Sequence, residues 1–154
     1  MGEVLFYHLT ARPLEQAAPQ ILEKCVERGW RVVVRAGSPE RAEGLNRLLW
    51  TYRDDGFLPH GGPNDGHAAQ QPIYLTAGPE TPNNPDVLLL CDGAAAEPSE
   101  MGKYMRALLM FDGHDEQAVS AARAAWVAIK NANLKAVYWA QTDEGGWVKK
   151  AESG

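Results

Sequence analysis

The stretch Trp30-Arg31-Val32-Val33-Val34-Arg35-Ala36-Gly37-Ser38-Pro39-Glu40-Arg41 decides the fold. Residues 30–35 form a β-branched run that is typical of a buried strand. Ser38 is a favourable helix N-cap, and Pro39 suits the first helical position. The helix that follows has an apolar face made of Leu45, Leu48 and Leu49, and it ends near Trp50. A strand followed at once by a helix is half of an α/β unit.

The residues before this stretch repeat the same pattern. Glu3 to Leu9 reads as an opening strand, and Pro13 to Glu27 has apolar residues at helical spacing. Gly29 then ends the helix. Pro19 conflicts with a continuous helix, because a proline either kinks a helix or marks its true start. Strand, helix, strand, helix in this order predicts an α/β domain with a parallel sheet.

The rest of the chain continues the alternation. We expect strands over 72–76, 86–91 and 135–142 and a long helix from about Asp115 to Ala132. Residues 105–111 are expected to be a strand, with a helix as the alternative. The prediction is α/β, a single Rossmann-like domain over 1–154 with a mainly parallel sheet flanked by helices and no phosphate-binding loop. The tail after about 143 is expected to be loosely ordered.

Composition limits the possible functions. The 154 residues carry a net charge of −5, which disfavours a dedicated duplex-DNA binder because such proteins need a basic surplus. No apolar run is long enough to span a membrane, and the start of the chain lacks the features of a secretory signal. We therefore expect a cytoplasmic protein. Cys25 and Cys91 lie in apolar segments and are predicted to be buried free thiols.

The sequence contains no recognisable catalytic or cofactor motif. The first strand leads into residues 8–13, which contain no glycine for a dinucleotide fingerprint. The glycine-rich stretch 61–66 lacks the Lys-Ser/Thr of a phosphate loop, and the spacing of His60, Asp65 and His67 matches no helical metal-ligand pair. We predict no catalytic residue, no cofactor and no metal. A small nucleotide-dependent enzyme of Rossmann-like fold is the alternative.

One stripe of the helix near the end of the chain combines apolar and cationic residues. Val119, Arg123, Trp126 and Lys130 share this stripe. The stripe next to it is the expected core face, with Ala118, Ala122, Ala125 and Ile129. An arginine beside an aromatic suits a peptide terminus, because the guanidinium grips a carboxylate bidentately. The alternative is that Trp126 packs in the core and Arg123 pairs with a surface acid.

A second distinctive segment runs from Leu49 to Gly61. Trp50, Phe57, Pro59 and His60 stand close together there around a short charged turn. Two large aromatics beside a proline indicate either a subunit interface or a tight packing corner.

Taken together, the chain resembles the chi subunit of bacterial DNA polymerase III, an accessory protein of the clamp-loader complex. The resemblance spans residues 4 to about 134, and the Trp50–His60 piece is its most specific part. Arg123 followed by aromatic Trp126 also belongs to it. The other matching segments are Phe6-Tyr7-His8-Leu9, Phe57-Leu58-Pro59-His60, Pro72-Ile73-Tyr74-Leu75 and Asp86-Val87-Leu88-Leu89.

The resemblance implies a non-enzymatic protein that binds the acidic C-terminal tail of single-stranded DNA-binding protein. Arg123 would take the terminal carboxylate, and Trp126 with Val119 would line an apolar pocket. Lys130, together with Arg106, would attract the acidic stretch of the tail. The resemblance also implies contacts with clamp-loader subunits, including psi where present, through Trp50 and Phe57.

In this interpretation the protein meets DNA only indirectly and contacts no membrane. A third hypothesis is direct binding of single-stranded DNA, with bases stacked on tryptophans. The net negative charge disfavours it. The tryptophans concerned are Trp30, Trp126, Trp139 and Trp147.

Overall fold

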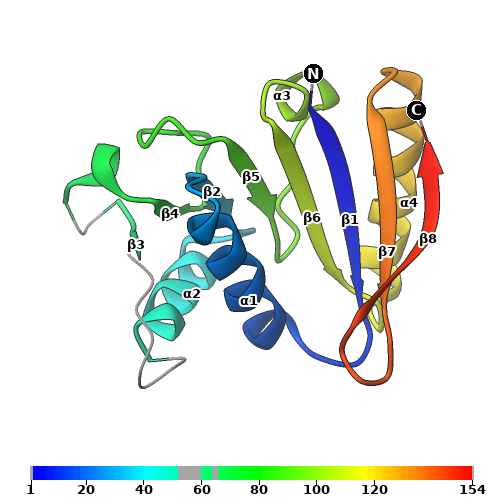
Figure 1. The fold of residues 1–154 in the computed structure, drawn as a ribbon, viewed down its shortest axis with the longest axis horizontal. Helices are drawn as coiled ribbons and strands as arrows, with labels where there is room; N and C mark the ends of the chain where they lie inside the picture. Colours follow the sequence, from blue (N-terminus) through cyan, green and yellow to red (C-terminus); the bar gives the residue numbers. More distant parts are fainter. Residues whose placement is uncertain (1, 52–59, 64–65, 154) are drawn as a thin grey trace.

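Eight strands form one sheet, in the order β3-β4-β2-β5-β6-β1-β7-β8, in a computed structural model that describes residues 2–51, 60–63 and 66–153 (Figure 1). The strands are β1 (Glu3–Leu9), β2 (Val32–Arg35), β3 (His60–Gly61), β4 (Ile73–Thr76), β5 (Val87–Leu90), β6 (Arg106–Asp112), β7 (Lys135–Gln141) and β8 (Trp147–Ser153). The helices are α1 (Leu14–Glu27), α2 (Pro39–Thr51), α3 (Pro98–Met101) and α4 (Glu116–Asn131), with one 3₁₀ turn, η1 (Ala68–Gln70).

The sheet is mixed, which corrects the mainly parallel arrangement expected from the sequence. Strands β1 to β7 pair in parallel, whereas β8 runs antiparallel to β7. The chain reverses between these two strands at Gly145, whose φ of 88° favours glycine. Residues 147–153, in the tail that the sequence predicts to be loosely ordered, therefore form an edge strand of the sheet.

Several local predictions are confirmed. The N–H of Arg41 donates to Ser38 Oγ at 3.2 Å, so Ser38 caps α2 as expected. Gly29, with φ of 78°, follows the end of α1. Helix α1 already begins at Leu14, so Pro19 lies inside the helix and does not mark its start. Residues 106–112 form a strand, which settles the helix alternative for that segment.

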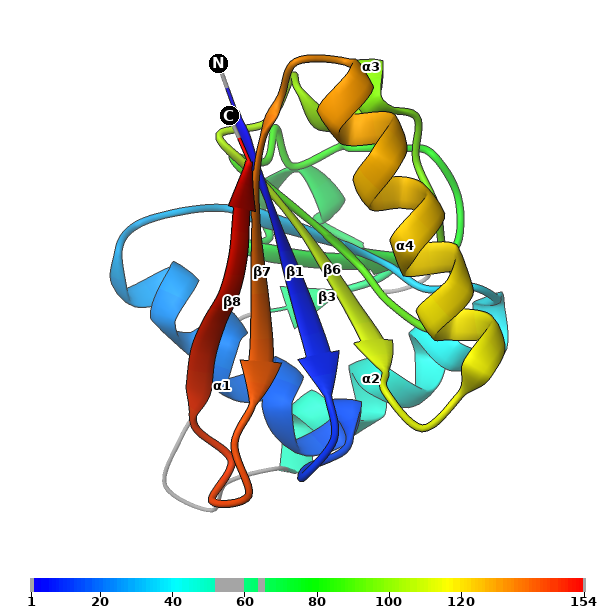
Figure 2. The ribbon, with the colours of Figure 1, turned by 90° about the vertical axis from the view of Figure 1, so that its right-hand side faces the viewer.

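Helices cover both faces of the sheet. Helices α1 and α2 pack their apolar residues on one face, together with Leu5 of β1 and Val34 of β2. Helix α4 packs on the opposite face, where Phe6 of β1 is fully buried. Figure 2 shows α1 and α4 on opposite sides of the strands β1, β7 and β8. Consecutive residues of β1 thus face two different cores, as the alternation of a strand requires.

The described residues add three general observations. Cys25 and Cys91 are buried free thiols, as predicted. In the part of the chain that the structure describes, no helix is both long and apolar enough to cross a membrane. Within that same part, no group of three or more His, Cys, Asp or Glu side chains is placed to hold a metal ion.

Candidate functional site

Helix α4 is fixed at its start by a side-chain cap. The Asp115 carboxylate accepts hydrogen bonds from the N–H groups of Gln117, at 3.0 Å, and Ala118, at 3.4 Å. These N–H groups belong to the first turn, where a helix has no partners of its own. Ala122 and Ile129 are buried against the sheet, so the rotation of the helix about its axis is set by the predicted alanine-rich face.

Trp126 is held between the helix and the sheet. Its ring meets the ring of Phe6 edge to face, with centroids 5.3 Å apart, and approaches the ring of Tyr138 at 6.0 Å. Trp126 is half-buried against the core on this face. The sequence left open that Trp126 packs in the core and that Arg123 pairs with a surface acid. The first of these two expectations is correct, because Trp126 does pack in the core. The remaining part of the indole stays accessible on the surface.

Arg123 is exposed one turn before Trp126, beside a hydrogen-bonded pair from the sheet. His8 Nδ1 lies 2.7 Å from the Tyr138 hydroxyl, and the His8 ring contacts Phe111. The positive charge of Arg123 is close enough to this pair to favour the uncharged imidazole and the ionised phenol. Burial nevertheless dominates both groups, lowering the pKa of His8 and raising the pKa of Tyr138.

The other residues predicted for this surface are Val119, Lys130 and Arg106. They differ in burial and in the face of the sheet on which they lie. Val119 is partly buried against the same core, whereas Lys130 is exposed in the last turn of α4. Arg106 lies on the opposite face of the sheet, where its guanidinium sits over Trp30 and binds Glu3. Arg106 therefore does not join Arg123 and Trp126. We call Val119, Arg123, Trp126 and Lys130 the α4 face.

The α4 face includes neighbours that the sequence analysis missed. Tyr138 and His8 complete the surface beside Arg123, and they lie far apart in the sequence. They meet because β1 and β7 are adjacent, with Phe6 opposite Tyr138 in the register. A sequence signal for this contact would have required the strand order, which local patterns do not contain.

The Trp50–His60 corner is described in part. The Trp50 ring lies against the His60 ring with centroids 4.5 Å apart, and His60 Nε2 lies 3.0 Å from the Asn46 carbonyl oxygen. His60 is buried, whereas 57% of Trp50 is exposed. Phe57 and Pro59 lie outside the described residues. His60 is thus part of the packing that supports an exposed tryptophan.

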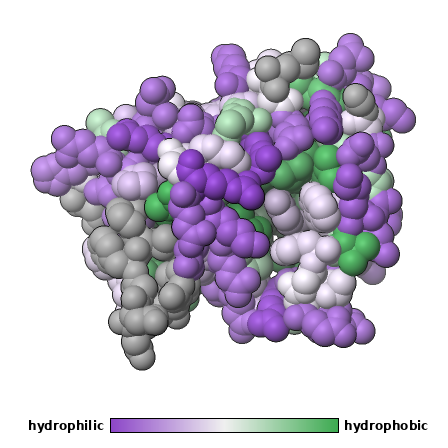
Figure 3. Space-filling model, viewed as in Figure 1, coloured by the Kyte–Doolittle hydropathy of each residue, from purple (hydrophilic) through white to green (hydrophobic). Residues whose placement is uncertain are grey.

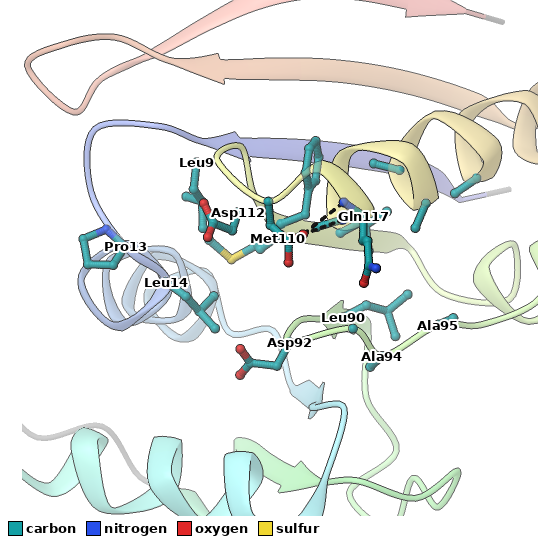
Figure 4. A pocket seen from close by; sticks show the side chains of 18 of the residues that line it. Leu9, Pro13, Leu14, Leu90, Asp92, Ala94, Ala95, Met110, Asp112 and Gln117 are labelled. Carbon is teal, nitrogen blue, oxygen red and sulfur yellow. Dashed lines mark hydrogen bonds between the residues drawn. The ribbon is translucent and has the colours of Figure 1, made fainter.

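A cavity of about 870 Å³ opens at the carboxyl ends of β1, β5 and β6. Figure 4 shows Leu14, Leu90 and Met110 around it, with Asp92 and Gln117 at its sides. In open α/β sheets this edge is the usual place for a ligand. Arg41 lines this cavity, and its guanidinium already forms ion pairs with two carboxylates of the lining, those of Glu15 at 3.0 Å and Asp92 at 3.1 Å.

The loop after β1 has its N–H groups committed elsewhere. In nucleotide-binding folds this loop offers N–H donors to phosphate. Here the N–H groups of Thr10, Ala11 and Arg12 all donate to Gln141 Oε1, at 3.1, 3.0 and 2.9 Å. These three N–H groups therefore already have an acceptor within the protein.

The comparisons with known proteins bear on this arrangement. The sequence model of the family described as DNA polymerase III chi subunit, HolC, matches residues 1–137. The chain belongs to this family. The match covers β1, which carries His8, and all of α4, and it ends inside β7, one residue before Tyr138.

A curated relative agrees with the family. It is named "Probable DNA polymerase III subunit chi", from Rickettsia prowazekii (strain Madrid E), and is 31% identical over 106 residues. The aligned part is 69% of this chi-family chain and 61% of the relative, so the chain spans about three fifths of the relative's length.

Proposed function

We propose that this chain is a non-catalytic accessory subunit that links the clamp loader to single-stranded DNA-binding protein during replication. The proposal rests on the α4 face. An exposed cation, Arg123, stands one turn from Trp126, an aromatic ring that the core holds in place. A peptide that ends in an apolar residue and a free carboxylate fits this pair, because a guanidinium binds carboxylates bidentately.

The rest of the surface supports the same ligand. Val119 extends the apolar area next to Trp126, and Lys130 adds a second cation one turn further along α4. The tail would place its terminal carboxylate on Arg123, its terminal apolar side chain against Trp126 and its acids toward Lys130. The Tyr138 hydroxyl is a further hydrogen-bonding group at the edge of the surface.

The decisive experiment is a titration of the protein with a fluorescently labelled tail peptide, followed by anisotropy. Arg123→Ala is expected to weaken binding by about tenfold or more, because a charge-assisted hydrogen bond contributes roughly 1.5–3 kcal/mol. Arg47→Ala is the matched control, since Arg47 is an exposed arginine on α2. Absence of measurable binding between the wild-type protein and the peptide at low salt would refute the proposal.

We also propose that Trp50 contacts a clamp-loader subunit, psi where that subunit is present. A large aromatic side chain with 57% of its surface exposed is typical of an interface residue. Its contact with His60 fixes the ring in advance. Trp50→Ala is expected to weaken binding to the clamp-loader subunit, measured by pull-down, without changing the affinity for the tail peptide.

The alternative, a nucleotide-dependent enzyme, is disfavoured by the contacts of Gln141. This side chain occupies the three N–H groups that would otherwise receive a phosphate. A thermal-shift panel of nucleotides with divalent metals would distinguish the two functions. We expect no nucleotide to raise the melting temperature, and a clear rise with one nucleotide would favour the enzyme.

We further propose that residues 1–154 are a single Rossmann-like domain. Strand β1 lies between β6 and β7, so an early strand of the chain is held between two late ones. Cutting the chain between these strands would separate the partners of β1. Limited proteolysis is therefore expected to release no stable fragment smaller than the sheet.

A further inference from the structure

The face of the sheet opposite α4 carries a second, smaller cavity. It has a volume of about 350 Å³ and lies between α1 and the strands β1, β6 and β7. In Figure 3, pale and apolar side chains gather in a hollow there, within a hydrophilic rim. We call this the Trp30 cavity. Four aromatic side chains line it: Tyr7, Trp30, Trp139 and Trp147.

These aromatics are arranged as a connected set. Trp147 meets Tyr7 edge to face, with ring centroids 4.9 Å apart. Tyr7, Trp30, Trp139 and Trp147 are all partly buried against the α1-side core, so each is held in place while part of it remains accessible. Three of the four tryptophans of the single-stranded DNA hypothesis thus come together on one face. The fourth, Trp126, lies on the other face.

The charged residues of the Trp30 cavity all have the same sign. Lys24, Arg28 and Arg106 line it, and no carboxylate does. Burial raises the pKa of Tyr7 to about 12 and also raises the pKa of the Cys25 thiol, so both groups are neutral at pH 7. The cavity is therefore a local cationic site on a protein whose net charge is −5.

Two of the cations are held directly against the central ring. The guanidinium carbons of Arg28 and Arg106 lie 5.0 and 4.9 Å from the Trp30 ring centre. A guanidinium stacked on a ring keeps its in-plane N–H donors for other partners. Arg106 uses its Nε to bind Glu3 at 3.1 Å. Among the described residues, neither Arg28 nor Lys24 forms an ion pair, so both retain donors for an anion.

We propose that the Trp30 cavity binds a short segment of single-stranded DNA, with a base against the tryptophans and phosphates on Arg28 and Lys24. Aromatic side chains interleaved with cations are the usual platform for single strands. The volume is at the lower end of the roughly 300–1,000 Å³ of small-molecule sites, which suits about one nucleotide. An acidic peptide fits less well, because a tail with one aromatic side chain would use only one of the four rings.

This proposal is independent of the tail-binding function, because the two surfaces lie on opposite faces of the sheet. The chain could then hold the tail of the single-stranded DNA-binding protein on the α4 face while the Trp30 cavity contacts the strand nearby. Direct contact with DNA replaces the purely indirect contact expected from the net charge, since only the local charge matters at short range.

The test is fluorescence anisotropy of the full chain with a labelled oligothymidylate at low salt. Trp147→Ala, on the edge strand β8, is expected to reduce affinity by about fivefold or more through lost stacking. Trp147→Phe should retain most of the binding. Arg28→Glu, at an exposed helix end, removes one phosphate contact. The fall of log affinity with log salt concentration should therefore become less steep, by about 0.7. Arg47→Glu makes the same charge change outside the cavity and should have a smaller effect.

Three competitors identify the ligand. An abasic oligonucleotide of the same length and free thymidine monophosphate should each compete at least fivefold less well than oligothymidylate. Equal competition by the abasic strand would show that charge alone acts and would overturn the proposal, and equal competition by the mononucleotide would assign the cavity to a free nucleotide instead. Displacement by the acidic tail peptide would make it a peptide site. Arg123→Ala should leave DNA binding unchanged, so failure of one proposal is separable from failure of the other.

Discussion

The ring of Trp126 meets the ring of Phe6 edge to face, with centroids 5.3 Å apart and an angle of 63° between the rings. Phe6 is fully buried at the centre of the core beneath α4. Trp126 therefore has two roles, since its inner edge completes the core while its outer part belongs to the surface where Arg123 lies. A substitution at this position changes stability as well as binding.

Trp126→Ala is expected to lower the free energy of unfolding by about 2–3 kcal/mol, somewhat less than a fully buried aromatic would cost. Trp126→Phe should recover much of that loss, because it keeps an aromatic edge against Phe6. Urea denaturation followed by circular dichroism measures both values. A loss below about 0.5 kcal/mol for the alanine variant would show that the indole does not pack on Phe6.

The pKa of His8 reports the position of Arg123. Burial lowers this pKa from 6.5, and the charges of His114 and Arg123 lower it further. Arg123→Ala should therefore raise the pKa of His8, whereas Lys130→Ala should leave it nearly unchanged. An NMR titration of the imidazole protons follows this directly. Because the folded pKa lies below the unfolded one, protonation of His8 favours unfolding, and stability should fall as the pH drops below about 6.5.

Gln141 is expected to be important for stability although it touches no proposed ligand. Gln141→Ala leaves the N–H groups of Thr10, Ala11 and Arg12 without their acceptor and should cost about 1–2 kcal/mol, since water reaches this loop. Gln141→Glu keeps an acceptor oxygen and should be much less destabilising. Chemical denaturation of both variants, with the exposed Gln117→Ala as control, tests this. Equal losses for the alanine and glutamate variants would contradict the role of Oε1.

A bidentate ion pair joins β2 to α3. Arg35 Nη1 and Nη2 lie 3.1 and 3.0 Å from the Glu100 carboxylate oxygens, and the arginine is buried. The hydrogen bond from Arg35 holds the pKa of Glu100 below 4.5. A carboxylate whose pKa is lowered by folding stabilises the protein above its unfolded pKa, and this contribution disappears as the pH falls through the folded value.

Glu100→Gln should therefore cost about 1–2 kcal/mol at neutral pH, a value reduced because the carboxylate is one third exposed. The difference from the wild type should stay constant above about pH 4.5 and shrink below it. Denaturation curves across this pH range measure it. A difference that did not depend on pH would show that the pair contributes only through packing.

The sequence predicted those parts of the fold that depend on local patterns. The N-cap at Ser38, the end of α1 just before Gly29 and the long helix α4 all follow from residues a few positions apart. The edge strand β8 did not, because Trp147–Ser153 is mostly polar and becomes a strand only by pairing with β7. Its antiparallel direction also made the sheet mixed. Pairing with a distant strand leaves little local signal.

In the candidate site, too, the features that depend on local sequence were predicted, whereas those that depend on contacts between distant residues were not. Helical periodicity placed Val119, Arg123, Trp126 and Lys130 on one stripe, and α4 carries them as expected. Periodicity could not show that Trp126 packs on Phe6 or that His8 and Tyr138 lie beside Arg123. The grouping of Trp30, Trp139 and Trp147 likewise depends on strand order. Only the assembled sheet separates these tryptophans from Trp126.

The position of β1 has a consequence for synthesis on the ribosome. This strand leaves the ribosome well before its two neighbours in the sheet, β6 and β7, which come much later in the chain. Its apolar residues therefore have no strand partner until most of the chain has emerged. Long-range pairing of this kind makes folding slow and leaves apolar surface exposed in the meantime. The nascent chain is thus expected to need chaperone protection, and a truncated product that ends before β6 should aggregate.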